Sequence, residues 1–315
     1  MVIWLPIILA IILIFVAIHL YCRKWVAQFR TNPSLYQIDF LLGEPDGIES
    51  YVETDDGARL RCVTEGEGQD VILAHGYGMT LVVWNSIWRQ LIEHGFRVIA
   101  FDHRGHGKTE LKNGKKITAD QMASDFVAVA KHFEVNNGIL VAHSMSGFLS
   151  IKALLKHPEL AQTHLDGLVL ISSVAGEGLR GAPQNRLQVP LLKWGILRLL
   201  SYVPTYRYLF GASVFGIYPT ASEIEAFNTI FFEHRHRPTM KVLQAICHES
   251  HYAELNQINL PCIVVAGTMD RTTPFSHSID LSQKIPNARL SKIEGMGHML
   301  IWEAPDDLID LILSL

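Results

Sequence analysis

The sequence predicts an α/β protein built on a doubly wound, mostly parallel sheet of eight strands, with an inserted helical cap. From residue 48 onward, short apolar runs alternate with amphipathic stretches, the pattern of a parallel sheet covered by helices on both faces. The alternation stops at residue 175 and resumes at 261, which indicates an insertion. A composition of 49% hydrophobic and 18% charged residues is typical of a folded chain.

The first element is an apolar segment. Residues 2–21 contain no Asp, Glu, Lys or Arg, and twenty helical residues span about 30 Å, the thickness of a hydrocarbon core. A cleaved signal peptide would have basic residues before a shorter apolar run and a small-residue cleavage site, and this segment has neither. We therefore expect residues 1–25 to form a single-pass transmembrane anchor, followed by a linker at residues 26–47.

The flanks of this segment predict an orientation and a compartment. Arg23, Lys24 and Arg30 follow the apolar run, so the positive-inside tendency places the rest of the chain on the cytoplasmic side of the membrane. The four cysteines lack the spacing of a disulfide framework or a zinc site, which is compatible with a reducing compartment.

Eight segments have the composition of strands. Two short ones are separated by the turn Asp55-Asp56-Gly57, and the later ones are near-continuous apolar runs typical of strands buried on both faces. The strands are expected at residues 49–53, 59–65, 70–74, 97–101, 138–142, 165–172, 262–266 and 289–293. Helices are expected at residues 81–93, 119–133 and 147–156, between the last two strands, and at the C-terminus. The core therefore comprises residues 48–174 and 261–315.

Residues 175–260 are expected to form a helical cap. They contain Leu-rich and aromatic helical runs at residues 191–202 and 206–218. An insertion at this point would lie over the C-terminal edge of the sheet, where such folds bind ligands. The apolar side chains of these runs favour a hydrophobic substrate, although ordinary helix packing explains most such stripes.

A candidate nucleophile lies where a strand passes into a helix. The residues there are Ala142-His143-Ser144-Met145-Ser146-Gly147. A nucleophile on such a tight turn needs small residues two positions to either side, and Gly-x-Ser-x-Gly is the usual solution. Ala142 and Ser146 occupy the glycine places and are both small. Ser144 is therefore predicted to be the nucleophile, and the alternative is that it only caps the next helix.

Two other turns follow strands at the same edge of the sheet. After the strand at 70–74 comes His75-Gly76-Tyr77-Gly78, where the backbone N–H groups of Tyr77 and Met145 would face the oxyanion of a tetrahedral intermediate. His75 itself is expected to be structural. After the strand at 97–101 comes Asp102-His103-Arg104-Gly105-His106-Gly107. Asp102 is expected to bind backbone amides of this turn rather than to take part in catalysis.

The remaining candidates come late in the chain. Asp270 follows the strand at 262–266, where its carboxylate could accept a hydrogen bond from a histidine Nδ1–H. Glu177 is an alternative acid, but it lies farther beyond its own strand. His298 follows the last strand, in a loop that also contains Gly297. Ser144, Asp270 and His298 occur in the chain order of a serine hydrolase triad, each in a loop after a strand.

On these motifs, residues 48–315 resemble the cap-bearing α/β-hydrolase superfamily, in its broad group of serine esterases, lipases and epoxide-hydrolase-like enzymes. The resemblance implies an α/β-hydrolase sheet with an oxyanion hole at Tyr77 and Met145. It also implies Ser144 as nucleophile, Asp270 as acid and His298 as base. Epoxide hydrolases and haloalkane dehalogenases of this fold use an aspartate nucleophile, so Ser144 argues against both.

The expected activity is hydrolysis of carboxylic esters through an acyl-enzyme on Ser144, with lipid-like or hydrophobic acyl substrates such as monoacylglycerols. The same triad could serve a lactonase, thioesterase, amidase, cofactor-free peroxidase or acyl transferase, and a non-enzymatic ligand-binding protein is a further alternative.

Composition also predicts what the protein does not bind. A net charge of −4 gives no broad basic field, so nucleic acid is not an expected partner. The sequence has no phosphate-binding loop, metal-ligand cluster or dinucleotide fingerprint, so we expect no cofactor and no metal. Lys112, Lys115 and Lys116 form a small basic cluster that could touch anionic lipid head groups, although a solvated loop accounts for it better.

Overall fold

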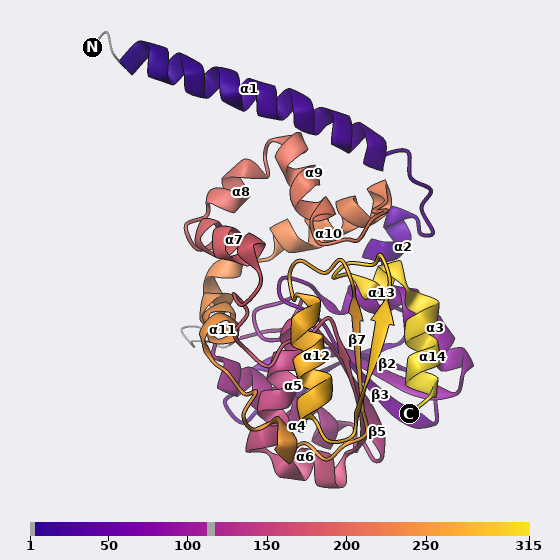
Figure 1. The fold of residues 1–315 in the computed structure, drawn as a ribbon. Coiled ribbons are helices and arrows are strands. Elements are labelled where there is room, and N and C mark those ends of the chain that lie inside the picture. The colour runs from indigo at the N-terminus through magenta and orange to yellow at the C-terminus, as the bar shows by residue number, and fades with distance from the viewer. Residues whose placement is uncertain (1–3, 112–116) are drawn as a thin grey trace.

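The centre of the molecule is a single sheet of eight strands in the order β1-β2-β4-β3-β5-β6-β7-β8 (Figure 1). The computed structural model describes residues 4–111 and 117–315. β1 and β2 pair antiparallel, β2 pairs antiparallel with β4, and every later neighbour is parallel. The strands are β1 (Ile48–Glu53), β2 (Arg59–Glu65), β3 (Gln69–Ala74), β4 (Phe96–Phe101), β5 (Gly138–His143), β6 (Leu165–Ile171), β7 (Cys262–Gly267) and β8 (Ala288–Ile293).

Helices cover both faces of this sheet, because its central strands are apolar on both sides. In β3, Val71 and Leu73 pack into one hydrophobic cluster, while Ile72 and Ala74 pack into the other. Side chains that alternate in this way require a helical layer on each face. The predicted fold class is therefore confirmed.

The helices of the core lie in two layers. One face carries α3 (Asn85–Glu93), α13 (Leu300–Glu303) and α14 (Pro305–Leu313), and the other carries α4 (Ala119–His132), α5 (Met145–Lys156), α6 (Pro158–Thr163) and α12 (Phe275–Lys284). Two short 3-10 helices, η1 (Leu81–Trp84) and η2 (Leu255–Gln257), complete the connections.

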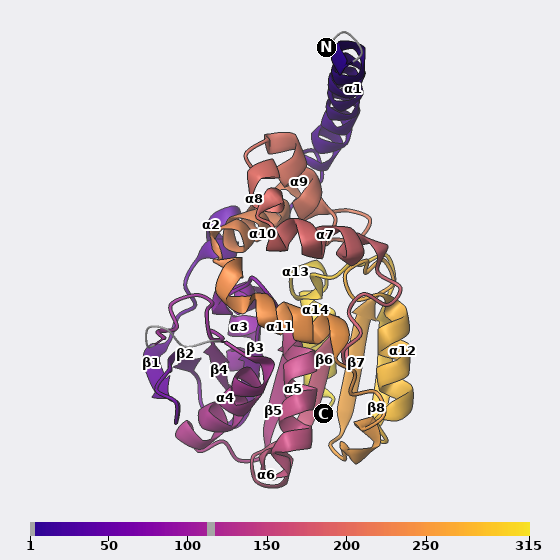
Figure 2. The ribbon, with the colours of Figure 1, turned by 90° about the vertical axis from the view of Figure 1, so that its left-hand side faces the viewer.

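A group of helices inserted between β6 and β7 lies above the C-terminal ends of the parallel strands (Figures 1 and 2). They are α7 (Pro183–Lys193), α8 (Ile196–Leu200), α9 (Pro204–Ala212), α10 (Ala221–Glu233) and α11 (His236–His248), and we call them the cap. The helical run expected at 191–202 is divided between α7 and α8, because Gly195 adopts a left-handed φ of 73°. The run expected at 206–218 ends as a helix at Ala212.

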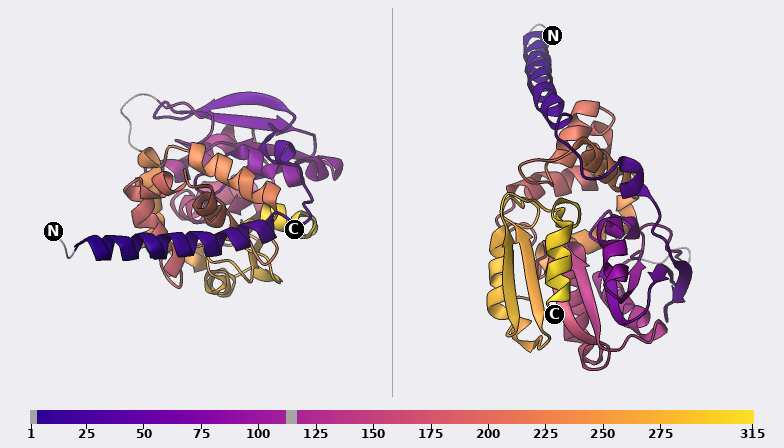
Figure 3. Two further views of the ribbon diagram at one scale, coloured as in Figure 1. Left: turned by 90° about the horizontal axis from the view of Figure 1, so that it is seen from above. Right: turned by 90° about the vertical axis from the view of Figure 1, so that its right-hand side faces the viewer.

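The N-terminal segment forms α1 (Trp4–Phe29), which runs across the top of the cap (Figure 3). The helix continues beyond the apolar run through Arg23 and Lys24, and its C-terminal part packs on α9. There the ring of His19 lies 6.3 Å from that of Tyr206, and Val26 is buried.

This arrangement corrects the prediction for the N-terminus. Within residues 4–111 and 117–315, no helix is long and apolar enough to cross a membrane. The predicted single-pass membrane localisation facing the cytoplasm is therefore wrong, and neither the transmembrane anchor at 1–25 nor the membrane as a partner is supported. The segment expected as a linker, 26–47, contains the end of α1 and the short helix α2 (Ile38–Leu42). The basic cluster of Lys112, Lys115 and Lys116 lies outside the described residues.

Candidate active site

Ser144 lies on the sharp turn between β5 and α5. Its φ of 54° and ψ of −112° are a strained backbone conformation for a residue with a side chain, at a cost of about 1–3 kcal/mol. The turn is held by the Ser144 N–H, which donates to the Ile171 carbonyl at 2.9 Å, and by the Gly147 N–H, which donates to the Ser144 carbonyl at 2.9 Å. Strain of this kind lifts the hydroxyl out of the sheet edge, as a nucleophile requires.

The structure explains why Ser146 is tolerated where a glycine is usual. Its hydroxyl donates to the His75 carbonyl at 2.5 Å and lies 2.6 Å from His103 Nε2. The close approach falls instead at Gly147, where a Cβ would lie 2.1 Å from the Oγ of Ser173, two residues beyond the end of β6. The turn therefore keeps one obligatory glycine, one position later than the usual motif.

The structure brings Ser144, His298 and Asp270 together. The Ser144 hydroxyl lies 2.9 Å from His298 Nε2, and His298 Nδ1 lies 2.8 Å from Asp270 Oδ2. Both His298 and Asp270 are buried, whereas Ser144 is partly exposed. With Nδ1–H donating to the carboxylate, His298 Nε2 is left as an acceptor for the serine proton.

Asp270 is held as an anion. Burial alone would raise the pKa of its carboxyl, but attraction to His298 and hydrogen bonds from His298 and Thr273 outweigh burial and lower the pKa. Oδ1 accepts from the N–H groups of Thr272 and Thr273, both at 2.8 Å, and Oδ2 accepts from the Thr273 hydroxyl at 2.7 Å. The carboxylate is thus fixed in position from three sides.

The roles of two residues of this site were not predicted from the sequence. Thr273 follows Asp270 in a turn, and an acidic residue followed by threonines was the only sequence signal for its role. His143 precedes Ser144, and its Nε2 lies 2.9 Å from the backbone carbonyl of His298. Burial and the nearby imidazole of His298 lower the pKa of His143 to about 3, so it is neutral and acts as a donor. No sequence pattern indicates that contact.

The loop after β3 lies beside Ser144, the candidate nucleophile. Tyr77 and Met145 both line the cavity that opens on Ser144. Met145 is the first residue of α5, so its N–H has no partner within the helix. The loop is fixed by the Gly78 N–H, which donates to His106 Nε2 at 3.1 Å, and by cap residue Thr239, whose hydroxyl donates to the Tyr77 hydroxyl at 3.2 Å.

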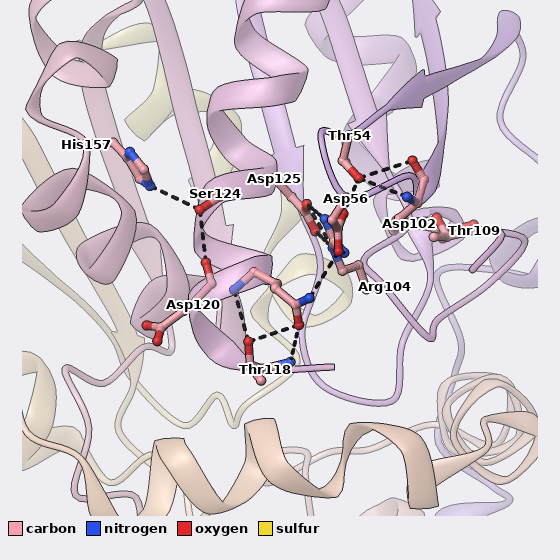
Figure 4. Close-up of polar contacts among 12 residues, drawn as sticks. Thr54, Asp56, Asp102, Arg104, Thr109, Thr118, Asp120, Ser124, Asp125 and His157 are labelled. Atoms are coloured by element: carbon pink, nitrogen blue, oxygen red, sulfur yellow. Dashed lines mark hydrogen bonds and ion pairs between the residues drawn. The ribbon is translucent and has the colours of Figure 1, made fainter. Parts of the chain in front are cut away.

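The turn after β4 is structural. Asp102 is fully buried and accepts the N–H groups of Leu81 at 2.8 Å and Lys108 at 3.0 Å. Arg104 pairs with Asp125 at 2.7 Å and with Asp56 at 2.6 Å, which ties this turn to α4 and to the β1–β2 hairpin (Figure 4). Burial raises the pKa of Asp125 to about 6 despite this pairing.

His75 and Glu177 also have structural partners. His75 Nε2 accepts the His103 N–H at 3.1 Å, and burial lowers the pKa of His75. Glu177, the alternative acid, pairs with Arg180 at 3.1 Å and accepts the Ser250 hydroxyl at 2.7 Å. Asp270 is therefore the acid that contacts the candidate base.

A cavity lined by residues of the core and the cap leads from the cap to Ser144. None of the described residues that line it is an Asp, Glu, Lys or Arg. Its apolar walls come from the core and the cap and include Met79, Val174, Leu192, Leu197, Phe210, Val214, Phe227, Phe231, Leu243 and Ile246. Its polar groups gather near Ser144 and at Asn185 and Gln188 on α7.

The sheet order, the cap and the strained serine turn define the α/β-hydrolase superfamily. The chain belongs to the hydrolase family described as serine aminopeptidase, S33, whose model matches residues 68–305. It is 25% identical over 264 residues to an AB hydrolase superfamily protein of Bacillus subtilis, covering 83% of this chain and 97% of that protein. It is 27% identical over 254 residues to a non-heme chloroperoxidase of Kitasatospora aureofaciens, covering 78% of this chain and 90% of that enzyme.

A solved structure shares the fold. An esterase from Exiguobacterium antarcticum superposes with a TM-score of 0.73 at 21% identity, covering 85% of this chain and 98% of the esterase chain. At this identity the likeness concerns the fold alone.

Proposed function

We propose that this protein is a serine hydrolase that cleaves carboxylic esters of hydrophobic acyl groups. The observation that carries the proposal is the apolar cavity that ends at a serine hydroxyl 2.9 Å from a histidine Nε2. A cavity of this kind excludes water from the acyl chain and leaves the carbonyl carbon beside Ser144.

The chemistry follows from the geometry. His298 Nε2 takes the proton of Ser144 as the hydroxyl oxygen attacks the ester carbonyl, and the Tyr77 and Met145 N–H groups stabilise the oxyanion. Collapse of the intermediate releases the alcohol, which takes the proton from His298, and leaves the acyl group on Ser144. Water, deprotonated by the same histidine, then releases the acid and restores the serine.

The lining of the cavity discriminates among substrate classes. A free α-amine or a charged acyl chain would lose its hydration in the cavity and find no oppositely charged side chain among the described lining residues. An aminopeptidase substrate therefore fits this site poorly, although the matching family is described by that activity. Neutral esters, and by the same reasoning neutral thioesters and lactones, carry no such cost.

A chain-length series tests the proposal. We expect the purified protein to hydrolyse p-nitrophenyl esters from acetate to laurate, with kcat/KM rising as the acyl chain fills the cavity. Leu-p-nitroanilide should not be cleaved, and S144A should retain no ester activity above background. Release of p-nitroaniline without release of p-nitrophenol, or full ester activity in S144A, would overturn the proposal.

A further inference from the structure

The segment that follows α9 in the cap, residues 214–217, runs alongside the loop that carries His298. The His298 N–H donates to the Val214 carbonyl at 2.7 Å, and the Ile217 N–H donates to the Gly295 carbonyl at 2.9 Å. The backbone of the candidate base is thus hydrogen-bonded directly to the cap. Any displacement of this cap segment would move His298 as well.

Two glycines allow these backbones to meet. A Cβ on Gly216 would lie 2.0 Å from the Gly295 carbonyl oxygen, and a Cβ on Gly297 would lie 2.3 Å from the carbonyl carbon of Phe215. Real Cβ atoms do not approach backbone so closely, so the contact requires glycine on both sides. The cap and the base loop therefore touch backbone to backbone.

Glu303, the last residue of α13, spans this contact. Its Oε1 accepts the Gly216 N–H at 2.6 Å and the Gly297 N–H at 3.0 Å, and its Oε2 lies 3.1 Å from the same Gly297 nitrogen. One carboxylate thus accepts an N–H from the cap and an N–H from the residue before His298. Hydrogen bonds to an ionised carboxylate are stronger than those between neutral groups.

We infer that Glu303 is a positioning residue that fastens the His298 loop to the cap and so holds the imidazole within reach of Ser144. This inference rests on the proposed function, because it assigns Glu303 to the same hydrolytic site. Glu303 touches neither Ser144 nor the His298 side chain in the structure and acts through the backbone at Gly297.

The pKa of the Glu303 carboxyl makes its role measurable in the pH dependence of activity. Burial raises the pKa of the Glu303 carboxyl to about 7, and the negative charges of Glu223 on α10 and Asp270 after β7 contribute to the rise. The hydrogen bonds from the Gly216 and Gly297 N–H groups act in the opposite direction. We call the Glu303 carboxylate, with its hydrogen bonds to Gly216 and Gly297, the clamp; it holds the backbone beside His298. Protonation of Glu303 weakens these hydrogen bonds, so the wild-type enzyme should lose activity as the pH falls through the pKa of Glu303.

The test compares E303Q with D307N. The glutamine side chain in E303Q would keep one acceptor oxygen but turn an NH₂ group toward a backbone N–H, whereas Asp307 is an exposed acid four residues on. We expect kcat for a preferred p-nitrophenyl ester to fall on the order of tenfold in E303Q with KM little changed. The acid limb of its pH profile should also become shallower. D307N should match the wild type.

Amide hydrogen exchange supplies a readout independent of activity. In E303Q the Gly216 and Gly297 amides should exchange faster, while the Ser172 amide, which donates to the Val265 carbonyl at 2.9 Å away from this loop, should keep its protection. If E303Q does not fold, E303D serves instead, because its shorter side chain keeps the charge but cannot reach both amides.

The outcomes separate this inference from the proposed function. An active wild type with an E303Q variant of unchanged kcat, pH profile and amide exchange would overturn the clamp. A wild type with no ester activity, together with faster exchange at Gly216 and Gly297 in E303Q, would overturn the proposed function and leave the clamp standing.

Discussion

At the scale of single residues, Asp270 determines which nitrogen of His298 can act as a base. The 2.8 Å contact from Nδ1 keeps the proton on that nitrogen and leaves Nε2 free to face Ser144. An asparagine at 270 could face His298 Nδ1 with its NH₂ group, which would favour the tautomer that has its proton on Nε2. It could instead face Nδ1 with a neutral oxygen, which stabilises the Nδ1–H tautomer less than a carboxylate does. We expect D270N to lower kcat by about 1,000- to 10,000-fold with KM nearly unchanged, measured on p-nitrophenyl esters.

The control for this prediction is D280N. Asp280 pairs with Arg180 at the surface of α12 and has no contact with the triad. D280N should keep wild-type kcat. A D270N enzyme with more than a tenth of wild-type kcat would show that another group orients His298.

Ser146 gives a second prediction at this scale. Its hydroxyl is buried between the His75 carbonyl and His103 Nε2, so S146A would leave both groups without that partner. We expect S146A to lower the free energy of unfolding by about 1–3 kcal/mol in urea denaturation. S150A should cost less, because Ser150 donates only to the Gly147 carbonyl of its own helix. Equal losses of unfolding free energy in the two variants would show that the contacts of Ser146 with His75 and His103 add no stability.

The site residues divide into those that the sequence could indicate and those that it could not. Ser144, Asp270 and His298 each follow a strand, and the carboxyl ends of parallel strands meet at one edge of a sheet, so their proximity was predictable. The roles of Ser146, Thr273 and Glu303 depend on which backbone groups a distant loop presents to them. Those contacts arise only from the packed fold.

At the scale of elements, α11 forms one wall of the cavity through Leu243. This side chain is partly exposed and lines the cavity, so a larger residue there can be accommodated while it narrows the channel. We expect L243W to lower kcat/KM for p-nitrophenyl laurate on the order of tenfold and to leave the acetate ester unaffected. Gln244 is exposed on the same helix, so Q244W is the matched control. An equal loss of kcat/KM for esters of all chain lengths would show that Leu243 does not line the part of the cavity that holds the acyl chain.

The elements also differ in how far the sequence predicted them. The strands from β3 to β7 were predictable because burial on both faces demands continuous apolar runs. The limits of the cap helices were not predictable, because they depend on single residues such as Gly195 and on contacts with the core. The N-terminal helix was interpreted as a membrane anchor from its apolar run and the basic residues after it, and no sequence pattern indicated that its C-terminal part packs on α9.

At the scale of the whole molecule, the cap and the core share one hydrophobic cluster. Phe215 and Phe227 from the cap lie in the same cluster as Trp302 and Leu300 from the core, and the rings of Phe215 and Trp302 stack at 6.3 Å. We therefore expect a single cooperative unfolding transition. Urea curves followed by far-ultraviolet circular dichroism and by tryptophan fluorescence should coincide. An early transition confined to the cap would show that it folds as a separate unit.

We expect Ser144 to act as the nucleophile of this site. A fluorophosphonate probe forms a stable covalent bond with an activated serine, so mass spectrometry of the labelled and digested protein tests the claim most directly. We expect one adduct, located on Ser144, that is absent from S144A and forms much more slowly in D270N. An active wild-type enzyme that carries no adduct, or an adduct on any other residue, would contradict it.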